Sequence, residues 1–598
     1  METGIPKPKY TGGILMKHKK LIALLLAGSM AVSMLAGCGS NKEENSQASS
    51  SAESSTSAAS SDSAASESSD SGEFDPRSIT EGVTLTIAIT ENARVEDYKT
   101  NETTLAIEEA LGVNLEFITY PAADFFEKIN VMIMSGDELP DMIFKGGSSS
   151  TDWSSWIAEG ALLPLTDYYS DPNLASNIIA FSEESGIDVA GSLTMADGEI
   201  YYLPTYGHSP NGEVFGRLWY YEPWLEEIGM DVPTTIDEFY EVCKVITETD
   251  LNGNGKKDEI ALGGDGLGSG QTDYWFNCLM CAFVYAWDKE YRIIEDGVVN
   301  YAYNTEAWRE GLRYIKKFFD DGIIPNETLT QSKDQWYAQI CAEEQTVWFF
   351  GDWEPYNTTN KPYEWVVDND CLMPLAGPDG TAYAMYRPGM PGLGGAITID
   401  CENPEAAFLV ANMFCSEELS ITKRFGQRGV DWDYWDEAKI EDKESYAAYD
   451  PSKEIYIICY NDGEFWSGTE IQNRSYMGYA PGLYGDKVFS GRATKVKGLT
   501  EDEQYVLDAQ NEVIAAYNAL HEYVPEQVFD YAPLTTEETE QIAEIKSSIK
   551  SYMLEMTGAF LAGNKDLDAD WDSYLAELKK IGIDEIIEVY QTAYDRVH

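Results

Sequence analysis

The chain after residue 82 alternates between strand-like and helix-like patterns of apolar residues. Residues 83–90 (VTLTIAIT) and 113–120 (VNLEFITY) alternate like half-buried strands, and residues 104–111 between them have helical spacing. A second helical pattern covers 124–134, and a third strand opens at 140–144. Strands separated by helices predict a parallel, doubly wound α/β sheet. No GxGxxG phosphate loop follows the first strand, which argues against a nucleotide-binding fold.

The N-terminus carries an export pattern. Three lysines within 17–20 precede an apolar run over 21–35, which is too short to span a bilayer well, and Leu-Ala-Gly then leads into Cys38. This order is typical of a bacterial lipoprotein signal, in which residues 1–37 are removed and Cys38 is lipidated. The alternative is a signal peptide that merely contains a cysteine. The pattern predicts a lipid anchor at the outer face of a Gram-positive cell membrane.

The stretch that follows has the composition of a tether. Residues 40–72 are mainly Ser, Ala, Glu and Asp, and they offer almost no apolar surface to offset the entropy of ordering. We therefore expect the lipidated cysteine and a disordered Ser-rich tether over 38–78. The remaining residues, 79–598, are enough for a folded part with two lobes.

The composition argues against several functions. A formal charge of −62 repels nucleic acid and anionic lipid. The four histidines form no HExxH motif, and neither a GxSxG elbow nor a GxxxxGK phosphate loop occurs. Cys278 and Cys281 form a CxxC without a second pair at zinc spacing, so we expect the eight cysteines beyond Cys38 to be buried free thiols. Aromatic residues make up 12% of the chain, which suits a protein that grips its ligand with flat rings.

Residues 250–259 (DLNGNGKKDE) place oxygen-bearing side chains at alternate positions, as a calcium loop does. Gly255 occupies the sixth place, where such a loop turns sharply, but the twelfth place, normally a bidentate Glu, is Ala261. The predicted ligands of a structural Ca²⁺ are Asp250, Asn252, Asn254, Lys256 through its carbonyl, Asp258 and Glu259. The alternative is a solvated Asn-Gly turn. The glycine-rich run that follows, 263–268, is expected to be a flexible connection.

Six blocks along the folded part resemble, in the same order, blocks of the extracellular solute-binding proteins of ABC transporters. Two of them read SGDELPD and GEIYYLP, and the full set is 135–141, 198–204, 219–260, 374–380, 403–407 and 563–596. The branch that this chain resembles most binds oligosaccharides and includes the alginate-binding proteins. One block departs from the family, because its RxDW reads Tyr221-Glu222-Pro223-Trp224 here and lacks the charged residues.

The resemblance implies a two-lobe, type II periplasmic-binding-protein-like α/β fold. Each lobe would be a sheet flanked by helices, and the chain would cross between lobes near 190–205 and again later. The resemblance also implies a monomer that binds an oligosaccharide in an inter-lobe cleft, without chemistry, and delivers it to the permease subunits of an ABC importer. The alternatives are a peptide or other small-solute receptor, a secreted glycoside hydrolase, and a calcium-dependent adhesion module of dockerin type.

A sugar site needs aromatic rings that stack on sugar faces and polar side chains that fix hydroxyls. Trp353, in FGDW, resembles a stacking element of the maltose-binding proteins, and residues 428–432 resemble a family loop. Asp152 and Trp153 are expected in the loop after the third strand, at the usual ligand edge of such a sheet. The candidate ligand-binding residues are Trp353, Trp432, Asp431, Trp153, Asp152, Trp219, Tyr220 and Tyr221. Each aromatic has the alternative of a position in the core.

Overall fold

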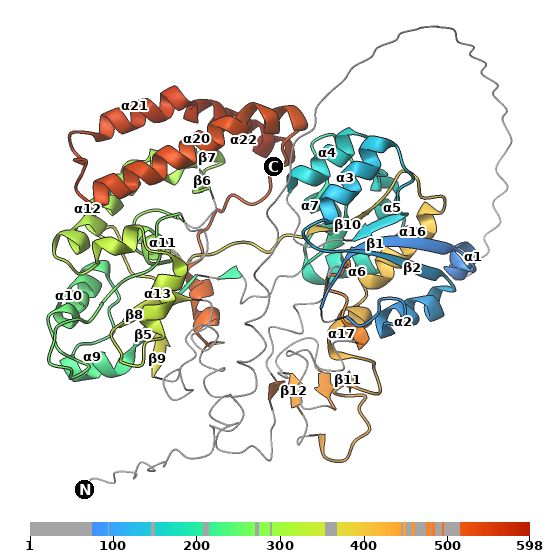
Figure 1. Ribbon diagram of the computed structural model, residues 1–598, viewed down its shortest axis with the longest axis horizontal. Helices are drawn as coiled ribbons and strands as arrows, with labels where there is room; N and C mark the ends of the chain where they lie inside the picture. Colours follow the sequence, from blue (N-terminus) through green and yellow to red (C-terminus); the bar gives the residue numbers. More distant parts are fainter. Residues whose placement is uncertain are drawn as a thin grey trace, which may run out of the picture. The chain divides into compact units, whose positions relative to one another are not determined.

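The computed structural model describes most of the chain from residue 74 to the C-terminus (Figure 1). The described residues are 74–93, 95–144, 150–206, 213–214, 216–268, 274–286, 290–352, 368–443, 447–449, 457–460, 474–478, 480–484, 493–494, 513 and 515–598. Residues Glu73–His598 form one compact unit. Cys38, the predicted signal peptide, most of the predicted tether and Trp353 lie outside the described residues, so the boundaries 1–37 and 38–78 stay predictions.

The first sheet has five strands in the order β2-β1-β3-β10-β4. β1 is parallel to both β2 and β3, whereas β10 comes from far along the chain and runs antiparallel to β3 and β4. The strands are β1 (Thr84–Thr90), β2 (Asn114–Tyr120), β3 (Met142–Phe144), β4 (Leu203–Thr205) and β10 (Gly392–Ile397). The first three coincide with the three strand patterns of the sequence, and the parallel start of the fold is therefore confirmed.

The two helices between these strands begin and end at suitable residues. α2 (Glu102–Leu111) begins after Asn101, whose side chain accepts a hydrogen bond from the amide of Thr103, and it ends at a left-handed Gly112. α3 (Phe125–Ser135) ends in the same way at Gly136. The other helices that pack around the first sheet are α1 (Arg77–Thr80), α4 (Ser150–Ala158), α5 (Thr166–Ser170), α6 (Ser176–Ser185), α7 (Val189–Leu193), α16 (Pro404–Phe414) and α17 (Glu417–Phe425).

A second, antiparallel sheet has the strand order β8-β5-β9. Its strands are β5 (Arg217–Tyr221), β8 (Phe349–Asp352) and β9 (Asn369–Cys371), so the chain passes from the first sheet to the second between β4 and β5. The helices whose buried residues share the cores of this sheet are α9 (Glu222–Ile228), α10 (Ile236–Thr247), α11 (Tyr274–Met280), α12 (Glu306–Asp320), α13 (Lys333–Ile340), α20 (Thr536–Leu561), α21 (Trp571–Ile581) and α22 (Ile583–Val597). Short 3-10 turns lie at Ala302–Asn304, Asn326–Leu329 and His521–Tyr523.

Two small sheets complete the described part. β6 (Arg292–Glu295) and β7 (Val298–Tyr301) form a hairpin whose turn residues Asp296 and Gly297 both have positive φ, 50° and 78°. Asp-Gly is the sequence that such a tight hairpin turn favours. The other sheet has the order β11-β13-β12-β14, with strands β11 (Trp432–Tyr434), β12 (Ala447–Tyr449), β13 (Ile457–Cys459) and β14 (Ala493–Thr494).

Each large sheet belongs to a core of its own. The core around the first sheet includes Ile87 and Ile143, and the core around α10 and α12 includes Phe239 and Trp308, all fully buried. A third, smaller cluster surrounds Trp219. Two separate α/β cores define two lobes, which confirms the predicted fold class. In the part of the chain that the structure describes, no helix is both long and apolar enough to cross a bilayer.

The glycine-rich run at 263–268 differs from the flexible connection that the sequence predicts. Gly263 and Gly264 are buried. A Cβ on Gly263 would lie 2.7 Å from the Trp336 indole, and one on Gly264 would collide with Trp275. Close packing of two indoles on the backbone, rather than freedom of the loop, is therefore the reason for glycine here.

The eight cysteines beyond Cys38 are free in the structure, and six of them are buried. The free thiols agree with the expectation from the sequence, whereas Cys341 and Cys371 are only half-buried. Burial raises the pKa of Cys281 to about 12, which keeps this thiol protonated and weakly nucleophilic.

Candidate functional site

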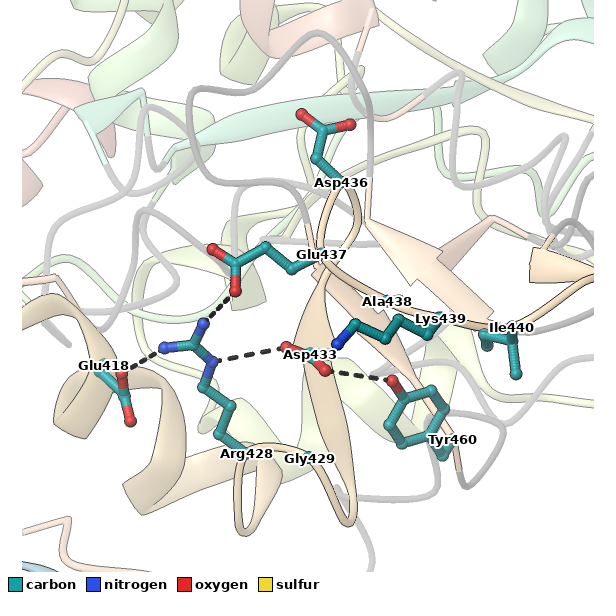
Figure 2. A pocket seen from close by; sticks show the side chains of 10 residues that line it. All are labelled: Glu418, Arg428, Gly429, Asp433, Asp436, Glu437, Ala438, Lys439, Ile440 and Tyr460. Atoms are coloured by element: carbon teal, nitrogen blue, oxygen red, sulfur yellow. Dashed lines mark hydrogen bonds and ion pairs between the residues drawn. The ribbon is translucent and has the colours of Figure 1, made fainter.

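A polar hollow of about 940 Å³ lies beside α17 and β11 (Figure 2). It is lined by charged and aromatic side chains that come from three segments of the chain. The lining residues are Glu418, Arg428, Gly429, Asp433, Asp436, Glu437, Ala438, Lys439, Ile440 and Tyr460. Glu418 comes from α17, Tyr460 follows β13, and the others belong to the loop and strand at 428–440. We refer to this hollow as the Arg428 pocket.

The alternation of strand β11 decides which side chains reach the Arg428 pocket. Trp432 is fully buried, donates its indole N–H to the carbonyl of Gly426 at 2.8 Å, and meets Tyr434 edge to face. Asp433, the next residue, points to the other side and lines the pocket. The family-like loop at 428–432 is therefore next to a pocket, but its tryptophan takes the core alternative that the sequence left open.

Arg428 binds three carboxylates at once. Its Nη1 lies 2.6 Å from Glu418 Oε2, its Nη2 contacts Glu437, and its Nε lies 3.4 Å from Asp433 Oδ1 (Figure 2). The guanidinium also lies over the Tyr434 ring, 4.6 Å from its centre. Partial burial acts to lower the pKa of Arg428, but the bonds to Glu418 and the other carboxylates outweigh it, and the net shift is upward. The arginine is permanently charged, and each of its three nitrogens contacts a carboxylate.

The carboxylates around Arg428 are held in fixed orientations by this network. Tyr460 adds to it by donating its hydroxyl to Asp433 Oδ2 at 3.4 Å. Carboxylates fixed in this way can accept hydrogen bonds from the hydroxyls of a bound solute, and the Tyr460 oxygen, which donates its proton to Asp433, can accept one as well. Asp436, Glu437 and Lys439 are exposed at the rim. Sequence reasoning missed Arg428, Glu418, Asp433, Glu437 and Tyr460 as pocket residues, although the strand-like alternation after Trp432 was a signal for Asp433.

Asp431, a predicted ligand contact, has a structural environment. It is 7% exposed, and its Oδ2 accepts a hydrogen bond from the amide of Gln427 at 2.8 Å. Its Oδ1 lies 3.1 Å from Nη2 of Arg474, which also contacts Glu102 of α2. Through Arg474, the Asp431 carboxylate thus ties the loop to α2.

Trp153 and Asp152 lie on helix α4 and not in the loop that the sequence predicts for them. Trp153 is fully buried and packs against Trp156, with ring centres 4.8 Å apart, and edge to face against Tyr202. Its ring has no exposed face for a ligand in this structure. The side chain of Asp152 lies outside the described residues.

The three aromatics of β5 occupy the central strand of the second sheet. Trp219 and Tyr220 are 1% and 3% exposed and face two different clusters, as successive strand residues do. Burial, with a smaller effect of Asp370, raises the pKa of Tyr220. Tyr221 is half-buried and meets Trp224 edge to face. Of the three, Tyr221 keeps the most exposed ring. Trp353 follows β8 directly and lies outside the described residues.

The predicted calcium loop is closed by its own side chains. Asp250 Oδ2 accepts a hydrogen bond from the Gly255 amide at 2.9 Å, and Asn254 Oδ1 accepts one from the Lys256 amide at 2.8 Å. Gly253 and Gly255 both have positive φ, 74° and 84°, which favours glycine at these two turns. The loop therefore curls around its oxygen-bearing side chains.

Two buried oxygens of this loop have no hydrogen-bond donor. Glu259 is 4% exposed, and its Oε1 accepts hydrogen bonds from the amides of Leu251 and Asn252 at 2.7 and 3.1 Å. Its other oxygen, Oε2, and Oδ1 of Asp250 are buried without a partner. Burying carboxylate oxygens without a donor or cation is costly, so the residues present fit a bound cation. Among the described residues no three His, Cys, Asp or Glu side chains are grouped to hold a metal by themselves, so amide and carbonyl oxygens would have to complete the ligand set.

The loop at 250–259 is hydrogen-bonded to residues 345–348, the segment just before β8. Asn252 Nδ2 donates to the carbonyl of Gln345 at 3.0 Å. The amide of Ile260 donates to the carbonyl of Thr346 at 2.7 Å, and the Trp348 amide donates to the carbonyl of Ile260 at 3.0 Å. Order in the loop therefore supports the segment just before β8 and Trp353.

The chain forms two α/β lobes with separate cores. The first sheet also takes in the antiparallel strand β10 from the second half of the chain. This architecture is that of a two-lobe solute-binding protein. Comparison with known families agrees. The chain belongs to the bacterial extracellular solute-binding proteins, whose family profile matches residues 96–419.

Three relatives illustrate the similarity. FusA, the fructooligosaccharide ABC transporter substrate-binding protein of Streptococcus pneumoniae, is 25% identical over 506 residues, covering 82% of this chain and 86% of FusA. The solved structure of a FusA EF-hand mutant with fructo-nystose has a TM-score of 0.60 at 22% identity and covers 86% of this chain and 99% of that one. An HMO-binding solute-binding protein from Bifidobacterium longum infantis has a TM-score of 0.68 at 17% identity, covering 86% and 99%. The alginate-binding protein AlgQ2, solved without calcium ion, has a TM-score of 0.56 at 21% identity, covering 86% and 98%.

Proposed function

We propose that this protein is the lipid-anchored substrate-binding component of an ABC importer and that it captures an oligosaccharide between its two lobes. The observation that carries the proposal is the similarity to FusA along 82% of the chain, together with the family membership. Release of the intact ligand to permease subunits follows from this role, and no chemical step on the sugar is needed. We expect a monomer, anchored through Cys38 at the outer face of the membrane.

The Arg428 pocket supports an oligosaccharide as the ligand. Sugar rings carry many hydroxyls, and a site for them needs donors and acceptors that are already oriented. Asp433, Glu437 and Tyr460 meet this need because Arg428 and the pairing between them fix their positions. We therefore propose the Arg428 pocket as part of the sugar-binding surface. Trp353 and Tyr221 remain the proposed stacking residues, and Asp152 remains a proposed polar contact.

We propose that the loop at 250–259 holds a structural Ca²⁺. Asp250, Asn252, Asn254, the carbonyl of Lys256, Asp258 and Glu259 would provide the oxygens, as the sequence predicts. The two unpartnered oxygens of Asp250 and Glu259 support this assignment. A bound cation would compensate their charge and tie the two ends of the loop together. Two similar solved structures also support a calcium site, since one is an EF-hand mutant of FusA and the other is AlgQ2 without calcium ion.

A glycan-library screen tests the proposed function. We expect the full chain to bind one or more oligosaccharides, measured by calorimetry or thermal shift, and to return them unshortened on chromatography. Shortened products would favour the glycoside hydrolase. Thermal shifts with peptides but with no sugar would favour the peptide receptor, and either result would overturn our proposal.

A further inference from the structure

The Arg428 pocket carries information on the charge of its ligand, and this inference rests on the proposed function. An arginine in a sugar site usually suggests a partner carboxylate or phosphate, because the two terminal nitrogens of the guanidinium match such a group. In this pocket the two terminal nitrogens are already occupied, Nη1 by Glu418 and Nη2 by Glu437. A sugar carboxylate would therefore compete with Glu418 and Glu437 for the guanidinium and would be repelled by both.

The remaining charges of the pocket also disfavour an anion. Among the described residues, the lining has four carboxylates, Glu418, Asp433, Asp436 and Glu437, against the two cations Arg428 and Lys439. The whole chain has a formal charge of −62, so the pocket lies in a strongly negative protein. Neutral hydroxyls have no such penalty, and they can donate to the carboxylate oxygens that Arg428 leaves unoccupied.

We propose that the Arg428 pocket selects neutral oligosaccharides and excludes uronates, with Glu418 and Glu437 as the specificity-determining residues. Arg428 is a positioning residue here, since it orients these carboxylates and does not itself receive the sugar. The protein would therefore take up neutral glycans and discriminate against the acidic sugars that some relatives bind.

The test compares affinities for matched neutral and acidic probes. Calorimetry with the full chain would use kestose, maltotriose, cellotriose and xylotriose as neutral trisaccharides and trigalacturonate as the acidic one. We expect at least one neutral probe to bind at least tenfold more tightly than trigalacturonate. Equal or tighter binding of trigalacturonate would overturn the inference and leave the proposed function standing. Failure of a wider glycan library to bind would overturn the proposed function itself.

Two double variants separate the local contact from the general field. Glu418→Gln with Glu437→Gln removes two charges and weakens the bonds to both terminal nitrogens of Arg428, because a neutral amide oxygen accepts a hydrogen bond less strongly than a carboxylate. Glu441→Gln with Asp442→Asn removes two charges nearby, from exposed residues that do not line the Arg428 pocket. We expect the first variant to lower the selectivity against trigalacturonate at least tenfold and the second to lower it less than threefold.

The selectivities of the two double variants can also contradict the proposal. Equal selectivity of the two double variants would show that the occupied guanidinium plays no part. Measurement at two salt concentrations adds a second readout, because added salt weakens the general field much more than the direct contact. Circular dichroism and thermal unfolding would establish that both variants are folded.

Discussion

Removing the cation from the loop at 250–259 is the perturbation with the most direct structural consequence. Without it, Oδ1 of Asp250 and Oε2 of Glu259 are buried with no partner. Leaving a buried acceptor unsatisfied costs about 1–3 kcal/mol, and more for a charged group, so the two together cost at least roughly 2–6 kcal/mol locally. For a dissociation constant of about 10⁻⁴–10⁻³ M, which is typical of extracellular calcium modules, about 2 mM Ca²⁺ stabilises the protein by roughly 0.6–1.8 kcal/mol.

Two measurements test this reasoning. A chelator should lower the melting temperature by about 0.5–2 °C, given the size scaling of unfolding. It should also speed amide exchange in the loop and at Thr346 and Trp348, which the loop supports through Ile260. Exchange in β1, which lies in the other core, should not change. The effect is expected to be local because, among the described residues, the hydrogen bonds that leave the loop go to the segment at 345–348.

Variants distinguish the cation from the hydrogen bonds of the loop. Asp250→Ala should abolish the response to the chelator. Glu259→Gln keeps an oxygen that can accept from the amides of Leu251 and Asn252, so it should weaken the calcium response while preserving the loop. Glu241→Ala, on the exposed face of α10, is the control and should respond like the unmodified chain. If the chelator changes neither melting nor exchange in the unmodified chain, the calcium assignment is refuted.

Four further predictions concern other parts of the molecule. A hydrogen bond to Glu213 raises the pKa of His521, whose Nε2 lies 3.0 Å from the carboxylate. The stabilisation by this pair is therefore complete below the unfolded pKa of about 6.5 and is lost as the pH rises through the higher folded pKa. Melting curves from pH 5 to 9 should show this loss, and His521→Asn should abolish the pH dependence. Trp353→Ala should weaken sugar binding by about 1–3 kcal/mol in calorimetry, and an unchanged affinity would contradict the stacking role of Trp353. Trp432→Ala deletes a buried ring and should cost about 3–5 kcal/mol of stability in denaturant unfolding. Iodoacetamide at pH 8 should leave Cys281 unmodified in the native protein, as mass spectrometry would show, because burial raises the pKa of this thiol to about 12.

The parts of the fold that depend on local periodicity could be predicted from the sequence. β1, β2 and the helices between the first strands follow patterns of 2 and 3.6 residues, and both helices have capping signals at their ends. β10 could not be predicted in this way. It reads GLGGAI and joins β3 and β4 from a distant part of the chain, so its place depends on tertiary pairing. Gly394 and Gly395 lie there in close contact with the backbone of Pro204 and Ile143, a reason for glycine that the sequence does not reveal.

For the candidate site, the sequence pointed to the region more reliably than to the residue. The loop at 428–432 does lie at a pocket, but an indole in a sequence is compatible with both a ligand face and a core. What decides between them at Trp432 is the register of β11, which turns the indole inward and Asp433 outward. Trp153 shows the same difficulty, because a helix replaces the expected loop and directs the ring into the core.

The calcium loop shows what structure adds to a motif that the sequence already contains. The sequence reveals that Ala261 replaces the usual glutamate and that Glu259 is the available substitute. It does not reveal that a single glutamate would serve two purposes. One oxygen of Glu259 accepts from the amides of Leu251 and Asn252 and so closes the loop, while the other is buried and available to a cation. This division explains how the loop can work without a ligand at its twelfth position. The same carboxylate both closes the backbone and faces the proposed cation. A loop that closes itself in this way can hold its shape with a weakly bound ion, which suits a structural role better than a sensory one.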